Sequence, residues 1–438
     1  MQMKSLNPAT LFKNQIMSEP IKSIDLLLYG ATGFTGRRTA SLLVRYAREY
    51  GLKITLAGRD AEKLNAVKKS IPQDLQSQFN FVAVRIDQAQ ELQLLLRQSR
   101  VLINTAGPFV RTGPILIPLC IEAKCDYLDI TGETPFVRDM IRDYDEEARK
   151  NKVRIVPFCG FDSIPSDLGV FLTVKQWTAR FPNEPLQRIT GLFSARGGIN
   201  GGTLASVYDL LETGKISEVL SSSQSNLALL SPEKTFSPPV KPDWYGPRRI
   251  PGGTSWGVPF FMSPINTRVV RRTQSLMAIH AEDPLLRKQY AEFYYEEGMA
   301  LSWPLAIVVG PLLGLMFRGA PALSKRKKIL AAIWKYLPAP GTGPSEESIQ
   351  NGFFEIKQIA QGRKGTRLVT SISAQGDPGN QVTVQCLVQS ALCLALENRR
   401  KLLRPRFGVL TPAFAFGEVL KDGLSEVGFS FRALLADD

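Results

Sequence analysis

Two short polar segments carry the side chains best suited to proton transfer. The segment 159–167 lies between a predicted strand and a predicted helix, and it contains Asp162 and Ser163. Glu133 follows the preceding strand in a similar way. A carboxyl or hydroxyl group can relay a proton, and the N–H groups of such a turn can stabilise a developing oxyanion. Asp162, Ser163 and Glu133 are therefore the candidate catalytic residues.

A structural role remains open for each candidate. Ser163 or Ser166 would cap the next helix, with Pro165 in its first turn. Glu133 would cap a helix or bind backbone. The one histidine, His280, falls at the end of a predicted strand and has a structural role, and no tyrosine stands four residues before a lysine. Neither a histidine relay nor a Tyr-x-x-x-Lys dyad is therefore expected.

The segment 26–37 has the spacing of a dinucleotide-binding turn. An apolar strand ends at Gly30 and a helix begins near Thr35. Gly30 permits a tight turn, Gly33 lets backbone N–H groups approach a pyrophosphate, and Gly36 lets the helix pack close to the sheet. The phosphates then lie at a helix N-terminus, which favours negative charge. The cofactor-binding candidates in this turn are Gly30, Thr32, Gly33, Phe34, Thr35 and Gly36.

The residue after the second strand, Lys53–Ala57, indicates which cofactor binds. An arginine at this position accommodates the 2′-phosphate of NADP, whereas an acidic residue binds the 2′-hydroxyl of NAD. Arg59 stands there, and Lys63 follows one helical turn later. We interpret Asp60 as the N-cap of the helix Ala61–Ser70. NADP(H) is therefore preferred, and NAD stays an alternative through Asp60.

Further strand patterns complete a doubly wound parallel sheet. They are Phe81–Arg85, Val101–Asn104, Asp126–Ile130 and Arg154–Phe158, and helices are predicted at Pro114–Ala123 and Pro135–Lys150. Right-handed crossovers between such units predict a Rossmann sheet of strand order 3-2-1-4-5-6. Asp87, after the third strand, is a candidate adenine contact or a helix cap. After the fourth strand, Ala106, Gly107 and Pro108 would line the nicotinamide side.

The second half of the chain reads as a mixed sheet backed by helices. The predicted strands are Ile189–Ala195, Arg268–Ile279, Gly352–Ala360 and Arg367–Ser373, and the predicted helices are Leu204–Glu212 and Val382–Leu396. The segment Ser231–Pro264 is rich in proline and glycine and is predicted to be a long irregular loop, a candidate lid. The segment Gly408–Phe431 should hold a helix and a final short strand.

Size and charge limit the functional classes. A chain of 438 residues is too long for one core, so two domains are expected. The net charge of +14 comes from dispersed basic residues without a nucleic-acid fold signature, which favours acidic ligands or an anionic membrane over nucleic acid. Five scattered cysteines and one histidine predict reduced thiols, no metal site and a cytoplasmic location. The first twenty residues lack the apolar core of a secretory signal.

One long segment has an unusual composition. The nineteen residues Met299–Phe317 contain no charged side chain, and Arg318 and the basic cluster 325–328 follow. This is about the length that a membrane-spanning helix needs, although Pro304 and Pro311 argue against a straight one. Three interpretations stay open: a buried or groove-lining element of a substrate domain, a peripheral membrane contact and a spanning helix.

The chain resembles the saccharopine dehydrogenase-like oxidoreductases, and within them the trans-acting enoyl reductase family. The matching strings run from about Ile24 to Gly417: YGATGFTG, LAGRDAEKL, NTAGPF, YLDITGE, FCGFDSIPSDLG, GGTLAS, VVRRT and GVLTPAFAFG. The pair GFDSIPSD and GGTLAS is the most specific. One departure is Asn380, where the family pattern has an aromatic residue after Asp377-Pro378-Gly379.

The resemblance implies a domain plan and a reaction. It makes 21–185 the NAD(P) domain, 186–405 an inserted α+β substrate and dimerisation domain, and 406–438 a segment returning to the first domain. From the sequence itself, residues 1–20 are expected to be a disordered lead or an overlong start, since Met17 could also begin the protein. The implied activity is NADP(H)-dependent reduction of a long-chain acyl or polyketide lipid, with a carrier-bound substrate, a homodimer and peripheral membrane contact compatible with it. A saccharopine-type C–N oxidoreductase and a non-catalytic, membrane-associated nucleotide-binding protein remain alternatives.

Overall fold

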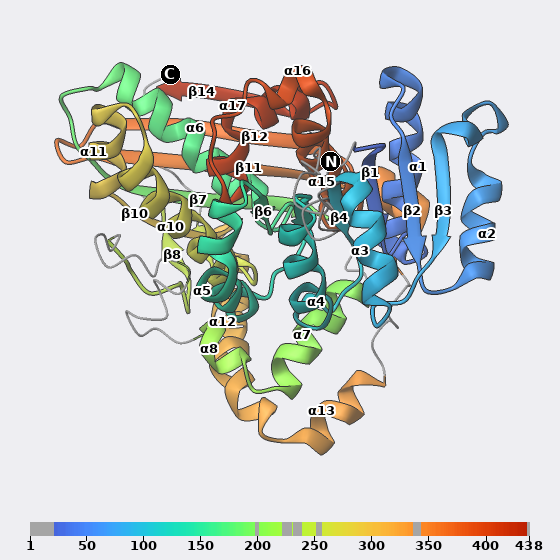
Figure 1. Cartoon of the computed structure of the whole chain (residues 1–438). Helices are drawn as coiled ribbons and strands as arrows, with labels where there is room; N and C mark the ends of the chain where they lie inside the picture. The colour runs from blue at the N-terminus through green and yellow to red at the C-terminus, as the bar shows by residue number, and fades with distance from the viewer. Residues whose placement is uncertain are drawn as a thin grey trace, which may run out of the picture.

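Two seven-stranded sheets with helices on their faces make up the fold (Figure 1). A computed structural model describes residues 22–197, 201–220, 230, 239–250, 256–335 and 343–435. The predicted lead 1–20 and parts of the predicted lid loop lie outside these residues. The predicted α/β class, a Rossmann sheet with a second mixed sheet, is confirmed.

The first sheet is parallel throughout and has the order β13-β6-β5-β4-β1-β2-β3. Its strands are β1 (Ile24–Tyr29), β2 (Ile54–Gly58), β3 (Phe79–Ala83), β4 (Ser99–Asn104), β5 (Asp126–Asp129), β6 (Arg154–Val156) and β13 (Gly408–Val409). The predicted order is confirmed, and β13 extends the sheet beyond β6. The central strands are buried on both faces, which explains their continuous apolar runs.

The helices of this half are α1 (Phe34–Tyr50), α2 (Ala61–Ser70), η2 (Gln73–Gln78), α3 (Ala89–Gln98), α4 (Phe109–Glu122) and α5 (Thr134–Lys150). The later helix α15 (Thr383–Ala395) packs against α1 and against β4 and β5. The prediction that α4 begins at Pro114 was wrong: it begins five residues earlier, with Pro114 and Pro118 inside it. The side chain of Glu133 binds the first N–H groups of α4, which allows the earlier start.

The second sheet is mixed, in the order β14-β12-β11-β7-β10-β9-β8. Its strands are β7 (Leu186–Arg196), β8 (Arg248–Arg249), β9 (Trp256–Val258), β10 (Tyr294–Leu301), β11 (Phe353–Gly362), β12 (Arg367–Gln375) and β14 (Ser430–Leu435). β7 and β10 run parallel, and the other neighbours are antiparallel. Burial alternates along β11 and β12, so one face lies in the core.

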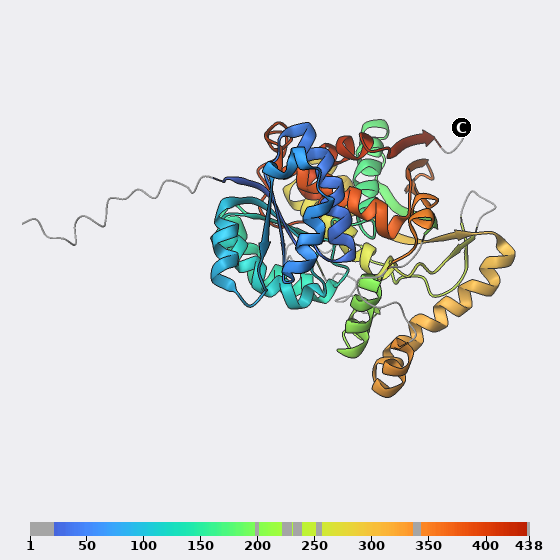
Figure 2. The same cartoon turned by 90° about the vertical axis from the view of Figure 1, so that its right-hand side faces the viewer.

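The remaining helices fall into two groups. The group around the second sheet and the chain end contains α6 (Ile164–Arg180), α10 (Ser263–His280), α11 (Pro284–Glu292), α14 (Glu346–Gln350), the π-helix η3 (Pro378–Val382), α16 (Glu397–Arg400) and α17 (Pro412–Ser425). The other group contains α7 (Gly201–Glu212), α8 (Ile216–Leu220), α12 (Trp303–Ser324) and α13 (Lys327–Trp334). In both views α12 and α13 project from the body of the protein (Figures 1 and 2).

The prediction of a strand at Arg268–Ile279 was wrong, because these residues belong to the helix α10. The β-branched pair at 269 and 270 suggested a strand, but the polar residues after it are buried as well. Arg271, Arg272 and Thr273 are at most 2 % exposed. A helix buried on nearly all sides has no amphipathic period to detect. His280 consequently lies in the last turn of a helix and not at a strand end.

Two further predictions need correction. The segment Ser231–Pro264 is not only a loop, because β8 and β9 within it pair into the second sheet and Trp244 is 3 % exposed. The uncharged segment Met299–Phe317 is not a single element, since it leaves β10 and continues as α12. The indole of Trp244 packs against Gly257 and Gly298, where a side chain would clash with the ring. This contact could not be predicted from the local sequence, because only the fold brings these residues together.

Candidate active site

A cavity of about 120 Å³ lies where β1, β4, β5 and β6 end, at the point where the strand order reverses. Ligands of open parallel sheets bind at such a point. Four lining residues follow β1 or β4: Thr35, Thr105, Gly107 and Phe109. Three follow β5 or β6: Ile130, Gly132 and Asp162. The others come from later in the chain: Val207, Leu210, Met262, Ile265, Gly379 and Thr383.

The glycine turn has the geometry of a pyrophosphate site. A Cβ on Gly36 would lie 2.1 Å from the Gly30 carbonyl oxygen, and one on Gly30 would lie 2.8 Å from the Ala106 nitrogen. These two glycines therefore permit close packing of backbone on backbone. A Cβ on Gly33 would meet only the Gly30 oxygen, at 3.4 Å, so the outer side of this turn is open. No side chain caps the N-terminus of α1, which leaves it available to an anion.

Residues near position 343 also reach this turn, which sequence reasoning missed. The ring of Phe34 fills the space beside Gly343, where a Cβ would lie 2.2 Å from the ring. Arg38 forms an ion pair with Glu346 at the start of α14. Arg37 donates a hydrogen bond of 2.9 Å to the Thr32 carbonyl and adds a second exposed cation beside the turn. Nothing in the local sequence links position 343 to position 34.

Arg59 lies exposed after β2, in the position predicted for a 2′-phosphate contact. Within the described residues its guanidinium makes no ion pair or hydrogen bond. Asp60 caps α2 by accepting a hydrogen bond of 3.0 Å from the Lys63 N–H, so the predicted capping role is confirmed. The Lys63 ammonium lies 3.4 Å from the Asp60 carboxylate. Of the two cations, Lys63 is paired with Asp60, so Arg59 is the one available to a phosphate.

The other residues predicted to contact the cofactor are less available to it. The carboxylate of Asp87 is exposed and accepts two hydrogen bonds, of 3.1 and 2.7 Å, from the Arg85 guanidinium. Gly107 lines the cavity, whereas Ala106 and Pro108 do not. The Ala106 N–H donates to the Asn104 side chain at 3.0 Å, which holds this turn in place.

Among the residues that the structure describes, Asp162 is the one acidic side chain that lines the cavity. It follows β6 and makes no hydrogen bond within the part of the chain that the structure describes. Burial raises the pKa of Asp162 from its usual value to about 6. The other cavity side chains are aliphatic, aromatic or hydroxylic, so the carboxyl group has little to stabilise its charged form.

The polar residues after Asp162 hold the turn in place from behind. The Ser163 hydroxyl donates to the Asn266 side-chain oxygen at 3.3 Å, and the Ser166 hydroxyl donates to Glu297 at 2.8 Å. Asp167 accepts the Ala413 N–H at 2.8 Å and a hydrogen bond from the Thr273 hydroxyl. Ser163 occupies the N-cap position of α6 with Pro165 in the first turn, as the structural alternative predicted, but its side chain forms no capping hydrogen bond, and Ser166 lies within the helix. Of the polar side chains in the FDSIPSD string, only that of Asp162 reaches the cavity.

The turn offers fewer free N–H groups than the sequence suggested. The N–H of Phe161 donates to the Thr383 hydroxyl at 3.3 Å. The N–H groups of Ser163 and Ile164 both donate to the Gly160 carbonyl, at 3.3 and 3.0 Å. The Asp162 N–H makes no hydrogen bond that the structure describes. An oxyanion site in this turn would therefore rest on the Asp162 backbone.

Glu133 has the backbone-binding contacts that the sequence left as its alternative role. It is 2 % exposed, and its two carboxylate oxygens accept hydrogen bonds from the N–H groups of Phe109 at 3.1 Å and Val110 at 2.8 Å. The carboxylate thus neutralises the positive end of α4. It does not line the cavity.

A buried polar network beneath the cavity was not predicted. The Asn104 side-chain amide donates to the Tyr127 hydroxyl at 3.0 Å, and that hydroxyl donates to Asp129 at 2.8 Å. Burial raises the pKa of Asp129 to about 7. Asn104 and Asp129 are the last residues of β4 and β5, so a polar residue at the end of a strand was their sequence signal. They fix the strand ends from which the cavity is built.

The far wall of the cavity comes from the second half of the chain. Val207 and Leu210 belong to α7, which follows the glycine-rich segment near 201, and Ile265 lies in the first turn of α10. Gly379 and Thr383 come from the Asp377-Pro378-Gly379 turn and α15. Asn380 faces away from the cavity lining and bonds to Asp377 through its N–H at 2.9 Å and its amide at 2.7 Å.

These features define a class of protein. Residues 26–156 match the saccharopine dehydrogenase NADP binding domain family. With the glycine turn and the open Arg59, this match makes the chain an NAD(P)-dependent oxidoreductase with an NADP-binding Rossmann domain.

Full-length relatives define the family. A protein of Mycobacterium tuberculosis strain H37Rv named as a trans-acting enoyl reductase is 32% identical over 426 residues, covering 95% of this chain and 99% of the relative. The trans-acting enoyl reductase of Mycobacterium ulcerans is 31% identical, and the match covers 94% of this chain and 98% of the relative. This chain belongs to the trans-acting enoyl reductase family.

Solved structures with low identity share the fold. The apo saccharopine dehydrogenase (L-Glu forming) of Saccharomyces cerevisiae has a TM-score of 0.50 at 12% identity and covers 93% of this chain and 99% of its own. The homospermidine synthase of Legionella pneumophila, solved with NAD, has a TM-score of 0.51 at 11% identity. The match covers 94% of this chain and 91% of the synthase. The saccharopine dehydrogenase-like architecture therefore extends through both sheets.

Proposed function

We propose that this protein uses NADPH to reduce the carbon–carbon double bond of a long-chain enoyl or polyketide lipid intermediate. The observation that carries the proposal is the cavity at the strand ends, which is apolar except for a few hydroxyl groups and the carboxyl of Asp162, a group without a hydrogen-bond partner among the described residues. Relatives that match nearly the whole chain are named as enoyl reductases, which supports the same reaction.

The residues have defined tasks in this reaction. The glycine turn and the N-terminus of α1 hold the pyrophosphate of NADPH, and Arg59 holds its 2′-phosphate. NADPH supplies a hydride when it is bound. As the hydride adds to the β carbon, the double-bond electron pair moves toward the thioester oxygen. The α carbon then takes a proton, and Asp162 is the acid placed to give it.

The raised pKa of Asp162 suits this task. With a pKa of about 6, roughly one carboxyl group in ten carries a proton at pH 7. An apolar substrate that excludes water from the cavity raises the protonated fraction further. An aspartate at its ordinary pKa would be almost fully ionised and a poor proton donor at the same pH.

The cavity argues against a saccharopine-type reaction. An amino-dicarboxylate substrate needs several cationic groups, but within the described chain no lysine or arginine lines this cavity. The walls formed by Phe109, Ile130, Val207, Leu210, Met262 and Ile265 suit an acyl chain instead.

A test would combine the purified protein with NADPH and trans-2-enoyl thioesters of N-acetylcysteamine with chains of four, ten and sixteen carbons. We expect NADPH oxidation with formation of the saturated product, faster for the longer chains. Turnover of a 2-oxo dicarboxylate with an amino acid, and of none of the thioesters, would refute the proposal. A carrier-bound thioester tested beside the free one would show whether a carrier protein is the donor.

We also propose that α12 and α13 bring the protein to an anionic lipid surface. α12 is long and apolar enough to cross a membrane, but only 22% of its most apolar window is buried within the protein. Its small residues Ala306, Gly310 and Gly314 face inward, and a Cβ at 314 would lie 2.0 Å from the Tyr245 carbonyl oxygen. Because one face packs on the protein, we favour a helix that lies on the surface over one that spans the bilayer.

We call α12 and α13 together the arm. Its outward face is apolar and its flank is basic. The exposed apolar side chains of α12 are Trp303, Leu305, Ile307, Val308, Leu312, Leu315 and Met316. Residues 302–335 contain no acidic side chain and six basic ones: Arg318, Lys325, Arg326, Lys327, Lys328 and Lys335. Apolar burial combined with attraction to anionic lipid is the usual basis of peripheral binding.

The arm is connected to the cavity through α7. The ring of Tyr208 packs against Trp334 of α13 in a tilted arrangement, with 4.3 Å between the ring centres, while its neighbours Val207 and Leu210 line the cavity. We therefore expect co-flotation with phosphatidylserine vesicles and less with phosphatidylcholine vesicles. Leu312→Glu with Leu315→Glu should abolish flotation, whereas Leu94→Glu, an exposed leucine on α3, should leave it unchanged. Equal flotation of both variants would refute the surface contact.

A further inference from the structure

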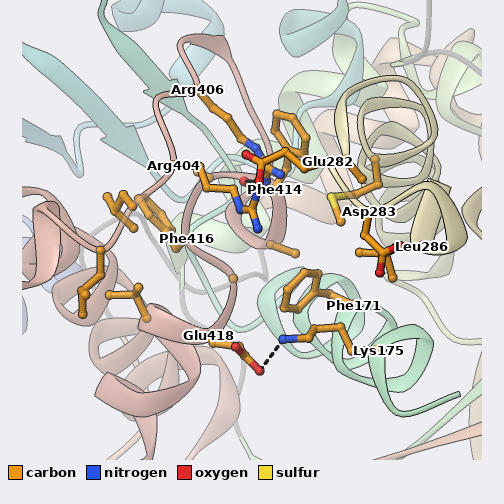
Figure 3. A pocket seen from close by; sticks show the side chains of 18 of the residues that line it. Phe171, Lys175, Glu282, Asp283, Leu286, Arg404, Arg406, Phe414, Phe416 and Glu418 are labelled. Atoms are coloured by element: carbon orange, nitrogen blue, oxygen red, sulfur yellow. Dashed lines mark hydrogen bonds and ion pairs between the residues drawn. The ribbon is translucent and has the colours of Figure 1, made fainter. Parts of the chain in front are cut away.

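A second cavity, of about 410 Å³, lies where α6, α11 and α17 meet (Figure 3). It shares no lining residue with the cavity of Asp162. Its volume falls in the range of roughly 300–1,000 Å³ that small-molecule sites occupy. The reaction proposed above gives this cavity no task.

Most charges around the cavity neutralise one another. The Lys175 ammonium pairs with Glu418 at 2.7 Å, and Arg404 forms an ion pair with Glu282 (Figure 3). In each pair at least one of the two side chains is more than half exposed, so the pairs form the rim of the cavity. Two further carboxylates line the cavity and are also held: Asp283 accepts the Leu285 N–H at 2.8 Å, and Asp422 lies 3.0 Å from the Lys421 ammonium.

Arg406 is the exception. It is half-buried, and within the described residues it forms no ion pair with a carboxylate. Its guanidinium lies 3.9 Å from the centre of the Phe414 ring and donates one hydrogen bond, of 2.7 Å, to the Phe414 carbonyl. Burial and the neighbouring Arg404 lower the pKa of Arg406 to about 10, so the group is charged at neutral pH. A guanidinium has five N–H donors in a planar fork, and most of those on Arg406 remain unused.

The body of the cavity is apolar. The rings of Phe171, Phe414 and Phe416 and the side chain of Leu286 surround the space beside Arg406 (Figure 3). Gly417 interrupts α17 here with φ 50° and ψ −126°, a conformation outside the helix. Gly417 itself lines the cavity. A site with apolar walls and one convergent cation suits an amphipathic anion.

We propose that this cavity binds an amphipathic carboxylate, with its head group on the Arg406 guanidinium and its apolar body among the three phenyl rings. A carboxylate matches the guanidinium fork with two parallel hydrogen bonds. It also gives Arg406 an anionic partner at ion-pair distance, because the described carboxylates that line the cavity are held by other groups. The proposal does not rest on the reductase reaction, because no residue of the reaction cavity takes part in it.

The test is calorimetric titration of the whole protein, with NADPH present, by decanoate and by decanamide. The two probes share an alkyl chain and differ in charge. We expect decanoate to bind at least tenfold more tightly than decanamide, because hydrogen bonds to charged groups contribute about 1.5–3 kcal/mol. Equal affinities, or no decanoate binding, would overturn the proposal on the unaltered protein alone.

Matched variants locate the site. Arg406→Met should weaken decanoate binding at least tenfold, whereas Arg404→Met, which removes a guanidinium already paired with Glu282, should weaken it less than threefold. Leu210→Trp fills the reaction cavity and should not change decanoate binding. If Leu210→Trp abolishes binding and Arg406→Met does not, decanoate occupies the reaction cavity and the inference is wrong. Equal losses in the two arginine variants would also contradict it.

Discussion

Replacing Asp162 with asparagine should make the protein less active and more stable at the same time. The change keeps the size of the side chain and removes its charge and its acidic proton. Loss of a general acid typically reduces turnover by about 10²–10⁴-fold. We therefore expect a fall in the reduction rate of this size, with the affinity for NADPH unchanged.

The stability effect follows from the pKa. Burial raises the pKa of Asp162 to about 6, above its value in the unfolded chain, so the folded state binds this proton more tightly. The resulting stabilisation is fully present below about pH 4 and is lost as pH rises through 6. A shift of about two pKa units corresponds to about 3 kcal/mol. Because the carboxyl group reaches cavity solvent, we expect Asp162→Asn to gain about 1–2 kcal/mol at pH 8.

The assay is urea unfolding of both proteins at pH 5 and pH 8, together with the turnover of the decenoyl thioester. The stability gain should be largest at pH 8 and about half as large at pH 5, because the loss of stability runs from about pH 4 to above pH 6. Asp74→Asn serves as the control, because Asp74 is exposed and its pairing with Arg48 lowers its pKa. A variant of Asp162 that keeps full turnover, or that is equally destabilised at both pH values, would refute the reasoning.

The other predictions concern the cofactor, the glycine turn and the buried acids. Arg59→Met should weaken NADPH binding about tenfold in a fluorescence titration and leave NADH binding unchanged; equal losses would remove Arg59 from the phosphate site. Gly36→Ala should lower the melting temperature, because its Cβ would lie 2.1 Å from a carbonyl oxygen; an unchanged temperature would contradict this packing. Burial raises the pKa of Asp167 and Glu297 to about 7. Unfolding free energy should consequently fall between pH 5 and pH 8, and Glu297→Gln should flatten that fall.

The first sheet could be predicted because its signals are local. Each predicted strand has an apolar centre, the first turn is marked by glycines, and right-handed crossovers then leave one strand order. The short β13, only Gly408–Val409, escaped because two residues have no period. The helix α10 escaped because buried arginines removed its polar face.

The site was predictable only on its nucleotide side. Gly33 and Arg59 could be placed because the turn and the strand end fix their positions in any fold of this type. Which polar residue of the 159–167 segment reaches the cavity could not be predicted. That depends on Asn266, Glu297 and Thr273, which lie about a hundred residues away in sequence and bind the others from behind. The walls from α7 and α10 depend on tertiary packing in the same way.

The last thirty residues of the chain close both sheets. β13 adds the outer strand beside β6, and β14 adds the outer strand beside β12. Between them, the N–H of Ala413 is bound by Asp167, deep in the first half of the fold. During synthesis on the ribosome, neither sheet can reach its final width until almost the whole chain has emerged. Until then two open sheet edges are exposed together, which makes the nascent chain dependent on protection from aggregation.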